Sequence, residues 1–162
     1  MVFMQIPTFT LDRQFQEIGS EIEDAVLKVL KDGQYIGGQE VNKFEEKFAS
    51  LIGVNHVIGC NSGTDALILA LRALNIGDGD EVITSSFSFF ATAEAISAVG
   101  AIPVLVDINP NDYLINIDLI EEEINPNTKA IMPVHLFGNA VNMNSIKTLA
   151  KKYDLKIIED CA

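Results

Sequence analysis

The sequence contains no tryptophan, only two cysteines, and about half as many basic as acidic residues, 11 against 23. Two isolated thiols cannot form a disulfide framework or a zinc site, so we expect Cys60 and Cys161 to be small, buried packing residues. The formal net charge of −12 argues against nucleic acids and anionic membranes as partners.

Long hydrophobic runs are also absent. No apolar run reaches the roughly 18 residues that cross a bilayer, and the N-terminus, Met1 to Pro7, lacks the basic start and long apolar stretch of a signal peptide. We therefore expect a cytoplasmic protein that contacts neither membrane nor nucleic acid. Of the 162 residues, 48% are apolar and 21% are charged, which is the composition of a globular domain with a core.

Hydrophobic periodicity predicts two opening helices and then a repeated alternation of strands and helices. The opening helical stripes cover Phe15 to Leu30 and Glu40 to Leu51. Strands are expected at 57–58, 81–84, 102–106, 130–134 and from 155 on, with helices at 65–74, 91–99, 118–124 and 144–153. This alternation is typical of an α/β domain with a mainly parallel sheet and flanking helices. We divide the chain into a helical segment, 1–52, and an α/β domain, 53–162.

The segment from Gly59 to Asp65 turns through small residues from an apolar run into a helix. Unpaired N–H groups at a helix start, together with the positive end of the helix dipole, favour an anion and above all a phosphate. The alternative is that Ser62 or Thr64 only caps the helix. The segment therefore predicts a phosphate site without excluding a simple cap.

Two adjacent acids, Glu159 and Asp160, end the last apolar run of the chain. With a side-chain period of two, Ile158 and Asp160 share one face of a strand, so only one acid can point at a given site. The carboxyl ends of parallel strands are where α/β sheets bind ligands. A carboxylate there, across from a phosphate cradle, suits pyridoxal phosphate, whose ring nitrogen an ionised Asp keeps protonated. The alternative for Asp160 is a helix cap or a solvated strand end.

His135 and a group of phenylalanines follow other strands of the predicted sheet. His135 ends a strand at the same edge as Asp160, which makes it a candidate neighbour of the cofactor, although a packing role is the more common use of a single histidine. Phe87, Phe89 and Phe90 follow the strand that ends at Thr84, so one ring could stack on a planar cofactor. We expect at least two of the three to lie in the core.

Motifs for other ligands are incomplete. The stretch 107–118 resembles a calcium loop but carries Asp112 where a glycine is needed. Gly77 and Gly79 have neither a preceding strand nor the third glycine of a dinucleotide fingerprint. We therefore expect no metal site and no dinucleotide site.

Six segments in order resemble the DegT/DnrJ/EryC1/StrS family of sugar aminotransferases, which are pyridoxal-phosphate enzymes of fold type I. They are Tyr35-Ile-Gly-Gly38 with Phe44-Glu45, Ser62-Gly-Thr-Asp-Ala-Leu67, Gly79-Asp-Glu-Val-Ile83, Phe89-Phe-Ala-Thr-Ala93, Val134-His-Leu-Phe-Gly138 and Ile158-Glu-Asp160.

The resemblance implies a role for each candidate residue. Gly63 and Thr64 would contact the phosphate, Phe89 would stack on the pyridine ring, and Asp160 would pair with the ring nitrogen. The reaction would move an amino group, usually from glutamate, to a keto group of a nucleotide-linked sugar, in a homodimer. Residues 53–162 would form the N-terminal part of the large cofactor-binding domain.

The lysine that binds the cofactor covalently in this family lies beyond the segment that ends in Asp160. None of the lysines here occupies its place, so we expect an N-terminal part of the enzyme that is inactive alone. Two alternatives stay open. One is a sugar dehydratase of the same superfamily, with a histidine in place of the lysine, and the other is a non-enzymatic relative that binds a phosphorylated ligand.

Overall fold

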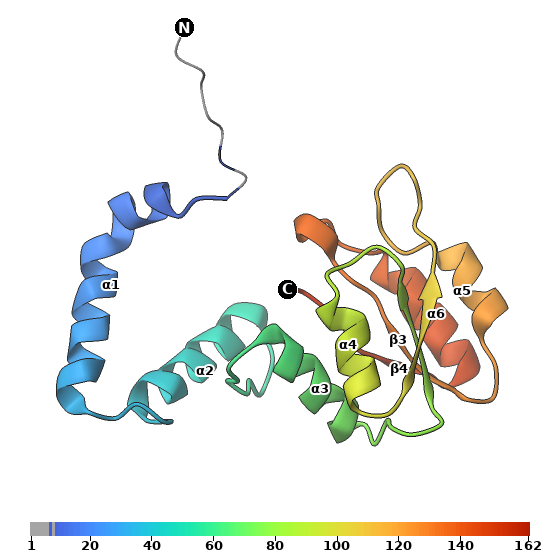
Figure 1. Cartoon of the computed structure of the whole chain (residues 1–162), viewed down its shortest axis with the longest axis horizontal. Coiled ribbons are helices and arrows are strands. Elements are labelled where there is room, and N and C mark those ends of the chain that lie inside the picture. Colours follow the sequence, from blue (N-terminus) through green and yellow to red (C-terminus); the bar gives the residue numbers. More distant parts are fainter. Residues whose placement is uncertain (1–6, 8) are drawn as a thin grey trace, which may run out of the picture. The chain divides into compact units, whose positions relative to one another are not determined.

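The computed structural model describes Pro7 and residues 9–162, which form two compact units (Figure 1). One unit ends at Gly59, and the other runs from Cys60 to Ala162. The break follows the stretch 54–59, which is neither helix nor strand.

The first unit contains two helices, α1 (Asp12–Asp32) and α2 (Gln39–Ile52), as the hydrophobic stripes predict. Each helix ends at a glycine in the left-handed conformation, Gly33 at φ 69° and Gly53 at φ 73°. Glu40 of α2 accepts a hydrogen bond from Lys28 of α1 at 2.9 Å and another from Lys43 of its own helix at 3.0 Å.

These two lysines lower the pKa of Glu40 to about 2, chiefly through the hydrogen bond from Lys28. A depressed pKa means that the pairing is present above the ordinary value of 4.5 and is lost as the pH falls toward 2. All three side chains are exposed to solvent, so the cluster contributes little to stability.

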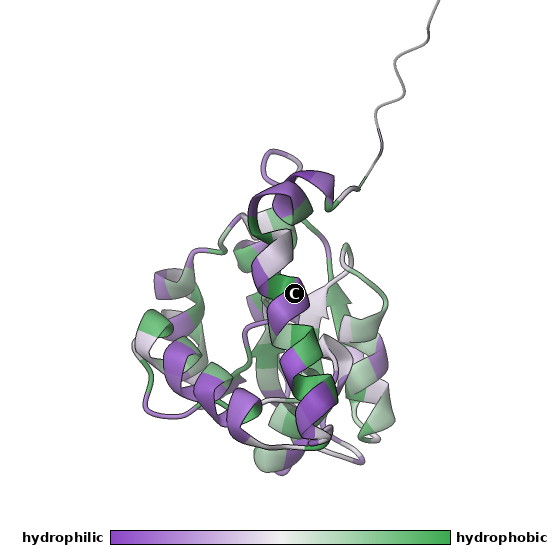
Figure 2. Cartoon of the chain, turned by 90° about the vertical axis from the view of Figure 1, so that its left-hand side faces the viewer, coloured by the Kyte–Doolittle hydropathy of each residue, from purple (hydrophilic) through white to green (hydrophobic). Residues whose placement is uncertain are grey.

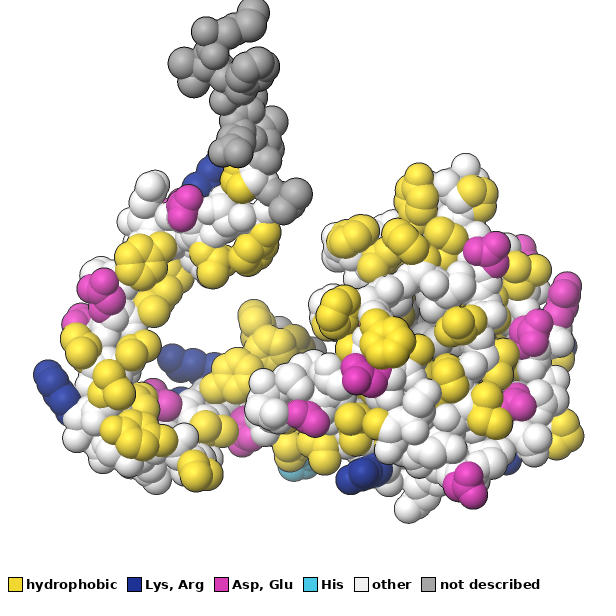
Figure 3. Space-filling model, in the orientation of Figure 1, with side chains coloured by type: hydrophobic (Ala, Val, Ile, Leu, Met, Phe, Trp, Pro, Cys, Tyr) yellow, Lys and Arg dark blue, Asp and Glu magenta, His cyan; other side chains and the backbone are white. Residues whose placement is uncertain are grey.

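Both helices of this unit keep much of their apolar stripe exposed. Phe15, Val26 and Leu30 on α1 and Phe44 on α2 are each more than half exposed. Hydrophilic and hydrophobic residues alternate along these helices in Figure 2, and their exposed apolar side chains are visible in Figure 3. Apart from the stacked pair Phe44 and Phe48, with ring centroids 5.5 Å apart, little packing within the unit covers these stripes.

The second unit is a four-stranded parallel sheet with the strand order β2-β1-β3-β4. Its strands are β1 (Glu81–Ser85), β2 (Ile102–Val106), β3 (Thr128–Met132) and β4 (Lys156–Ile157). Its helices are α3 (Gly63–Ala73), α4 (Ala91–Ala98), α5 (Ile117–Glu123) and α6 (Met143–Tyr153). This architecture confirms the predicted α/β class. A short 3₁₀ turn, Leu136–Gly138, follows β3.

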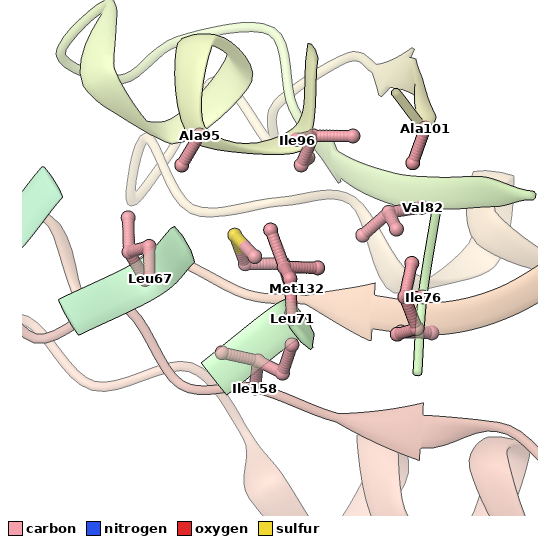
Figure 4. Packing of buried hydrophobic residues seen from close by; sticks show 10 residues of the cluster. Leu67, Leu71, Ile76, Val82, Ala95, Ile96, Ala101, Met132 and Ile158 are labelled. Atoms are coloured by element: carbon pink, nitrogen blue, oxygen red, sulfur yellow. The ribbon is translucent and has the colours of Figure 1, made fainter. Parts of the chain in front are cut away.

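Strand residues alternate between two hydrophobic cores, one on each face of the sheet. On one face, Val82 and Met132 pack against Leu71 of α3 and Ile96 of α4 (Figure 4). The opposite core joins Ile83 and Ile131 of the sheet to residues of α5 and α6. Helices therefore cover both faces, with α4 on one side of the sheet and α5 and α6 on the other (Figure 1).

Three strand predictions need correction. Residues 57–58 form no strand, because a strand requires a hydrogen-bonded neighbour and these residues join no ladder within the described chain; Ile58 is 77% exposed. The strand expected at 130–134 ends at Met132, since Pro133 has no N–H to donate to a ladder. Val134 instead forms an isolated parallel bridge with Asp160. The last strand, β4, ends at Ile157 and does not continue to Asp160 as expected. Helix α1 begins three residues before the predicted Phe15, and the other bounds differ from the predicted ones by at most two residues.

No helix in the described part of the chain combines the length and apolarity needed to cross a bilayer. The described helices are instead amphipathic or packed on the sheet.

Leu71 offers a direct test of the core between α3, α4 and the sheet. Its side chain is fully buried, so Leu71→Ala removes apolar contacts and leaves a cavity. We expect a loss of about 2 to 5 kcal/mol in the free energy of unfolding, measured by urea denaturation of the 162-residue chain. Leu69→Ala is the matched control, because Leu69 lies on the same helix but is half exposed. Equal losses for both variants would contradict the packing described here.

Candidate functional site

A pocket of about 200 Å³ lies in the second unit where the carboxyl ends of β1 and β3 approach the N-terminus of α3. The chain leaves β1 toward β2 on one side of the sheet and leaves β3 toward β4 on the other, so the adjacent carboxyl ends of β1 and β3 form the topological switch point where α/β sheets bind ligands. The lining groups that matter chemically are Gly63, Thr64, Ser88, Phe89, Thr92 and Asp160.

The N-terminus of α3 presents two backbone donors to this pocket. The Ser62 hydroxyl accepts from the N–H of Asp65 at 3.1 Å and donates to its carboxylate at 3.0 Å, and the Ser62 carbonyl accepts from the N–H of Ala66. The N–H groups of Gly63 and Thr64 have no acceptor within the described residues. Ser62 is thus the cap of this helix, while the N–H groups of Gly63 and Thr64 remain available to an anion.

Asp160 is 5% exposed and is held on both its backbone and its side chain. Its N–H donates to the carbonyl of Pro133 at 3.0 Å, and its own carbonyl accepts from the N–H of His135 at 2.9 Å. One carboxylate oxygen, Oδ2, accepts from the Thr92 hydroxyl at 2.8 Å, and Oδ1 accepts from the N–H of Ala162 at 3.1 Å. Asp160 is therefore neither a solvated strand end nor a helix cap.

The predicted alternation around Asp160 is confirmed. Ile158 packs in the core with α3 and α4, on the face where Asp160 meets Thr92 of α4, whereas Ile157 packs against the opposite core. Glu159 points away from the pocket and pairs with His135.

Phe89 lines the pocket and is 80% exposed, so its ring face is free to receive a flat ligand. The expectation that two of Phe87, Phe89 and Phe90 lie in the core is wrong, because all three are substantially exposed. They occupy the loop between β1 and α4, beyond the carboxyl end of the strand, where no helix among the described residues buries them. The Phe87 ring lies tilted by 49° against the ring of Tyr113, with ring centroids 6.2 Å apart.

His135 does not line the pocket with its side chain. Its Nδ1 accepts from the N–H of Val141 at 3.1 Å, so the ring proton sits on Nε2, which faces Glu159 at 3.0 Å. Both ring nitrogens are thereby engaged. His135 contributes to the site through its backbone N–H, which binds the carbonyl of Asp160.

The expectation that the cysteines are buried is wrong. Cys60 and Cys161 are both exposed, because each lies in an irregular stretch beside an end of the sheet rather than on a packed face. Partial burial, together with the nearby carboxylates of Glu159 and Asp160, raises the pKa of the Cys161 thiol. The raised pKa keeps this thiol protonated and weakly nucleophilic at neutral pH.

Thr92 and Ser88 belong to the site but are not among the predicted site residues. Thr92 lies in the first turn of α4 and Ser88 four positions earlier, and their hydroxyl oxygens are 2.8 Å apart. A spacing of four at the start of a helix that follows a strand is the signal that could have identified them, since it places both on the edge where Asp160 lies.

The pocket therefore combines three separate kinds of contact. Two free N–H groups favour an anion, an exposed aromatic ring favours a flat group, and a buried carboxylate favours a protonated ring nitrogen or another cationic donor. Its volume lies below the roughly 300 to 1,000 Å³ typical of drug-sized ligands, which suits a single-ring ligand.

Comparison with known proteins identifies relatives over nearly the whole chain. One relative, a UDP-N-acetyl-3-dehydro-alpha-D-glucosamine 3-aminotransferase of Acidithiobacillus ferrooxidans, is 50% identical over 97% of this chain. The crystal structure of DesV of S. venezuelae in complex with a ketimine intermediate aligns with a TM-score of 0.92 and 41% identity over 96% of this chain. That of NtdA of Bacillus subtilis with the bound cofactor PMP aligns with a TM-score of 0.92 and 38% identity over 99%.

The chain spans less than half the length of each of these proteins, 42%, 42% and 37% respectively. The family model for DegT/DnrJ/EryC1/StrS aminotransferases matches residues 16–162, so both units of the chain lie largely within it. The chain therefore belongs to the DegT/DnrJ/EryC1/StrS aminotransferase family.

Proposed function

We propose that the pocket binds pyridoxal 5′-phosphate and its amino form, pyridoxamine 5′-phosphate. The N–H groups of Gly63 and Thr64 hold the phosphate, Phe89 stacks on the ring, and Asp160 accepts from the protonated ring nitrogen. The observation that carries this proposal is the buried carboxylate of Asp160 in the same small pocket as two free N–H groups. A phosphate site alone would need no such acid.

The reaction that we propose is transfer of an amino group, with glutamate as donor, to the keto group of a nucleotide-linked sugar. When bound, the cofactor supplies an electron sink for the carbon that gains or loses a proton. Asp160 keeps a proton on the ring nitrogen, and Phe89 shields one face of the ring from water. The 50% identity to a relative named for amination of a UDP-linked keto sugar supports this substrate class.

The lysine that would bind the cofactor covalently is proposed to lie outside these residues. Residues 1–52 would then form a helical segment, and residues 53–162 a part of the cofactor-binding domain. We further propose a homodimer, in keeping with the apolar stripes that α1 and α2 leave exposed within their own unit. A cytoplasmic location accords with two free, exposed thiols, which suit a reducing compartment.

Binding of pyridoxamine 5′-phosphate to the 162-residue chain tests the proposed cofactor. This probe needs no lysine, so calorimetry reports only the contacts of the pocket. Each charge-assisted hydrogen bond contributes about 1.5 to 3 kcal/mol, so we expect the phosphorylated compound to bind at least about tenfold more tightly than pyridoxamine. Equal affinity for the two compounds would contradict the phosphate site.

A further inference from the structure

Two hydroxyl groups, those of Ser88 and Thr92, form a chain of hydrogen bonds that ends at the carboxylate of Asp160. The Ser88 and Thr92 oxygens are 2.8 Å apart, and Thr92 Oγ1 is 2.8 Å from Asp160 Oδ2. Thr92 is 2% exposed and Asp160 is 5% exposed, so water does not substitute for either contact. All three residues line the pocket.

The direction of these hydrogen bonds follows from counting protons. An ionised carboxylate can only accept, so the single hydroxyl proton of Thr92 points to Asp160. Thr92 then has no proton left for Ser88, and Ser88 must donate to Thr92. Both hydroxyl protons therefore point toward Asp160, and Ser88 is left with acceptor lone pairs at the pocket wall.

We propose that Thr92, supported by Ser88, is a positioning residue that orients the carboxylate of Asp160 toward the ring nitrogen of the cofactor. This inference rests on the proposed function of the pocket. Thr92 on Oδ2 and the N–H of Ala162 on Oδ1 set the plane of the carboxylate, and each oxygen keeps a lone pair for a further donor. The ring N–H is that further donor.

The alternative is that Thr92 has a purely structural role. Its hydrogen bond to Asp160 would then only provide a buried hydroxyl with a partner. Thr84 is such a residue: its hydroxyl is fully buried in β1 and donates to the carbonyl of Met132 at 2.8 Å, outside the pocket lining. Thr84→Val therefore removes a buried hydroxyl without touching the pocket, and it is the matched control for Thr92→Val.

The test uses the 162-residue chain and pyridoxamine 5′-phosphate labelled with ¹⁵N in the ring. The ring ¹⁵N shift followed against pH reports where the nitrogen loses its proton. For Thr92→Val we expect this loss to begin at lower pH than in wild type and the affinity to fall about tenfold, as for one hydrogen bond to a charged group. Thr92→Ser, which keeps the hydroxyl, should restore both, and Ser88→Ala should shift both in the same direction but less.

Two outcomes of the Thr92 titrations would overturn the proposal. One is a Thr92→Val titration of the ring nitrogen that matches wild type, and the other is a Thr92→Ser titration as disturbed as that of Thr92→Val. Thr84→Val is expected to lower the thermal midpoint while leaving the ring titration unchanged; a shift equal to that of Thr92→Val would make the effect a general loss of stability.

The exchange rate of the Thr92 hydroxyl proton with water, measured in the ligand-free chain, tests the positioning role without the cofactor. Its outcome can therefore be distinguished from a failure of the proposed function. The buried bond to Asp160 predicts a slowly exchanging proton, visible by NMR and lost in Asp160→Ala. Failure of the wild-type chain to bind the probe would contradict the cofactor assignment. A rapidly exchanging Thr92 hydroxyl would contradict the positioning role whether or not the probe binds.

Discussion

Asp160→Asn in the holoenzyme is expected to leave the cofactor bound and to reduce turnover by at least about a hundredfold, the scale of losing one preorganised electrostatic contact in an active site. Asn is nearly isosteric, but it cannot hold a positive ring nitrogen through an ion pair, so the proton there is lost more readily. The free energy of binding pyridoxamine 5′-phosphate should weaken by no more than about 3 kcal/mol, because the substitution leaves the proposed phosphate contacts at Gly63 and Thr64 in place.

The fold should tolerate Asp160→Asn. The new amide can donate to Thr92, whose hydroxyl can then turn toward Ser88, so no buried group loses all its partners. Glu159→Gln is the matched control, since it changes the adjacent carboxylate, which faces His135 rather than the pocket. Steady-state kinetics measures the turnover of each variant, and calorimetry measures its affinity for the cofactor. Near-normal turnover in Asp160→Asn would make Asp160 a structural residue only.

Thr64→Glu is expected to remove the preference of the pocket for a phosphorylated ligand. Thr64 lies at the second position of α3 and lines the pocket, so a carboxylate there repels the phosphate from the two free N–H groups. Binding of pyridoxamine 5′-phosphate should weaken at least about a hundredfold, from the loss of two charge-assisted bonds, while binding of pyridoxamine changes little.

An acidic residue in the first turn favours a helix, so Thr64→Glu should not destabilise the chain. Asn144→Glu places the same charge at the second position of α6, outside the pocket, and serves as the control. Thermal unfolding should show both variants at or slightly above the wild-type midpoint, and calorimetry should show a binding defect in Thr64→Glu alone. If both variants bind the phosphorylated probe as wild type does, α3 does not hold the phosphate.

Local signals in the sequence were sufficient to predict most helices and strands, and also the two parts of the pocket formed by Asp160 and by the start of α3. The alternation of Ile157, Ile158, Glu159 and Asp160 follows from the period of a strand alone, and the structure places Asp160 in the pocket as that period requires. The small residues before α3 likewise indicate a turn into a helix start, and Ser62 proves to be its cap.

What the sequence could not predict depends on tertiary neighbours. The apolar pair Val57 and Ile58 predicts a strand, but no strand among the described residues pairs with it. Hydrophobicity suggests that at least two of Phe87, Phe89 and Phe90 are buried, yet no helix among the described residues covers the loop beyond β1, and all three are exposed. The role of Thr92 requires knowing that α4 and the segment after β4 lie side by side, a contact between residues 68 positions apart.

The short strand β4 makes the chemistry of the site sensitive to residue count. Ile157 and Ile158 pack in opposite cores, so a shift of one position would keep an isoleucine in one core and bring Lys156 or Glu159 into the other. The same shift would bring Glu159 or Cys161 to the pocket in place of Asp160. A single insertion or deletion between Asp154 and Asp160 would thus disturb a core and the proposed cofactor site together. Natural variants of this segment should accordingly differ by substitution and not by length.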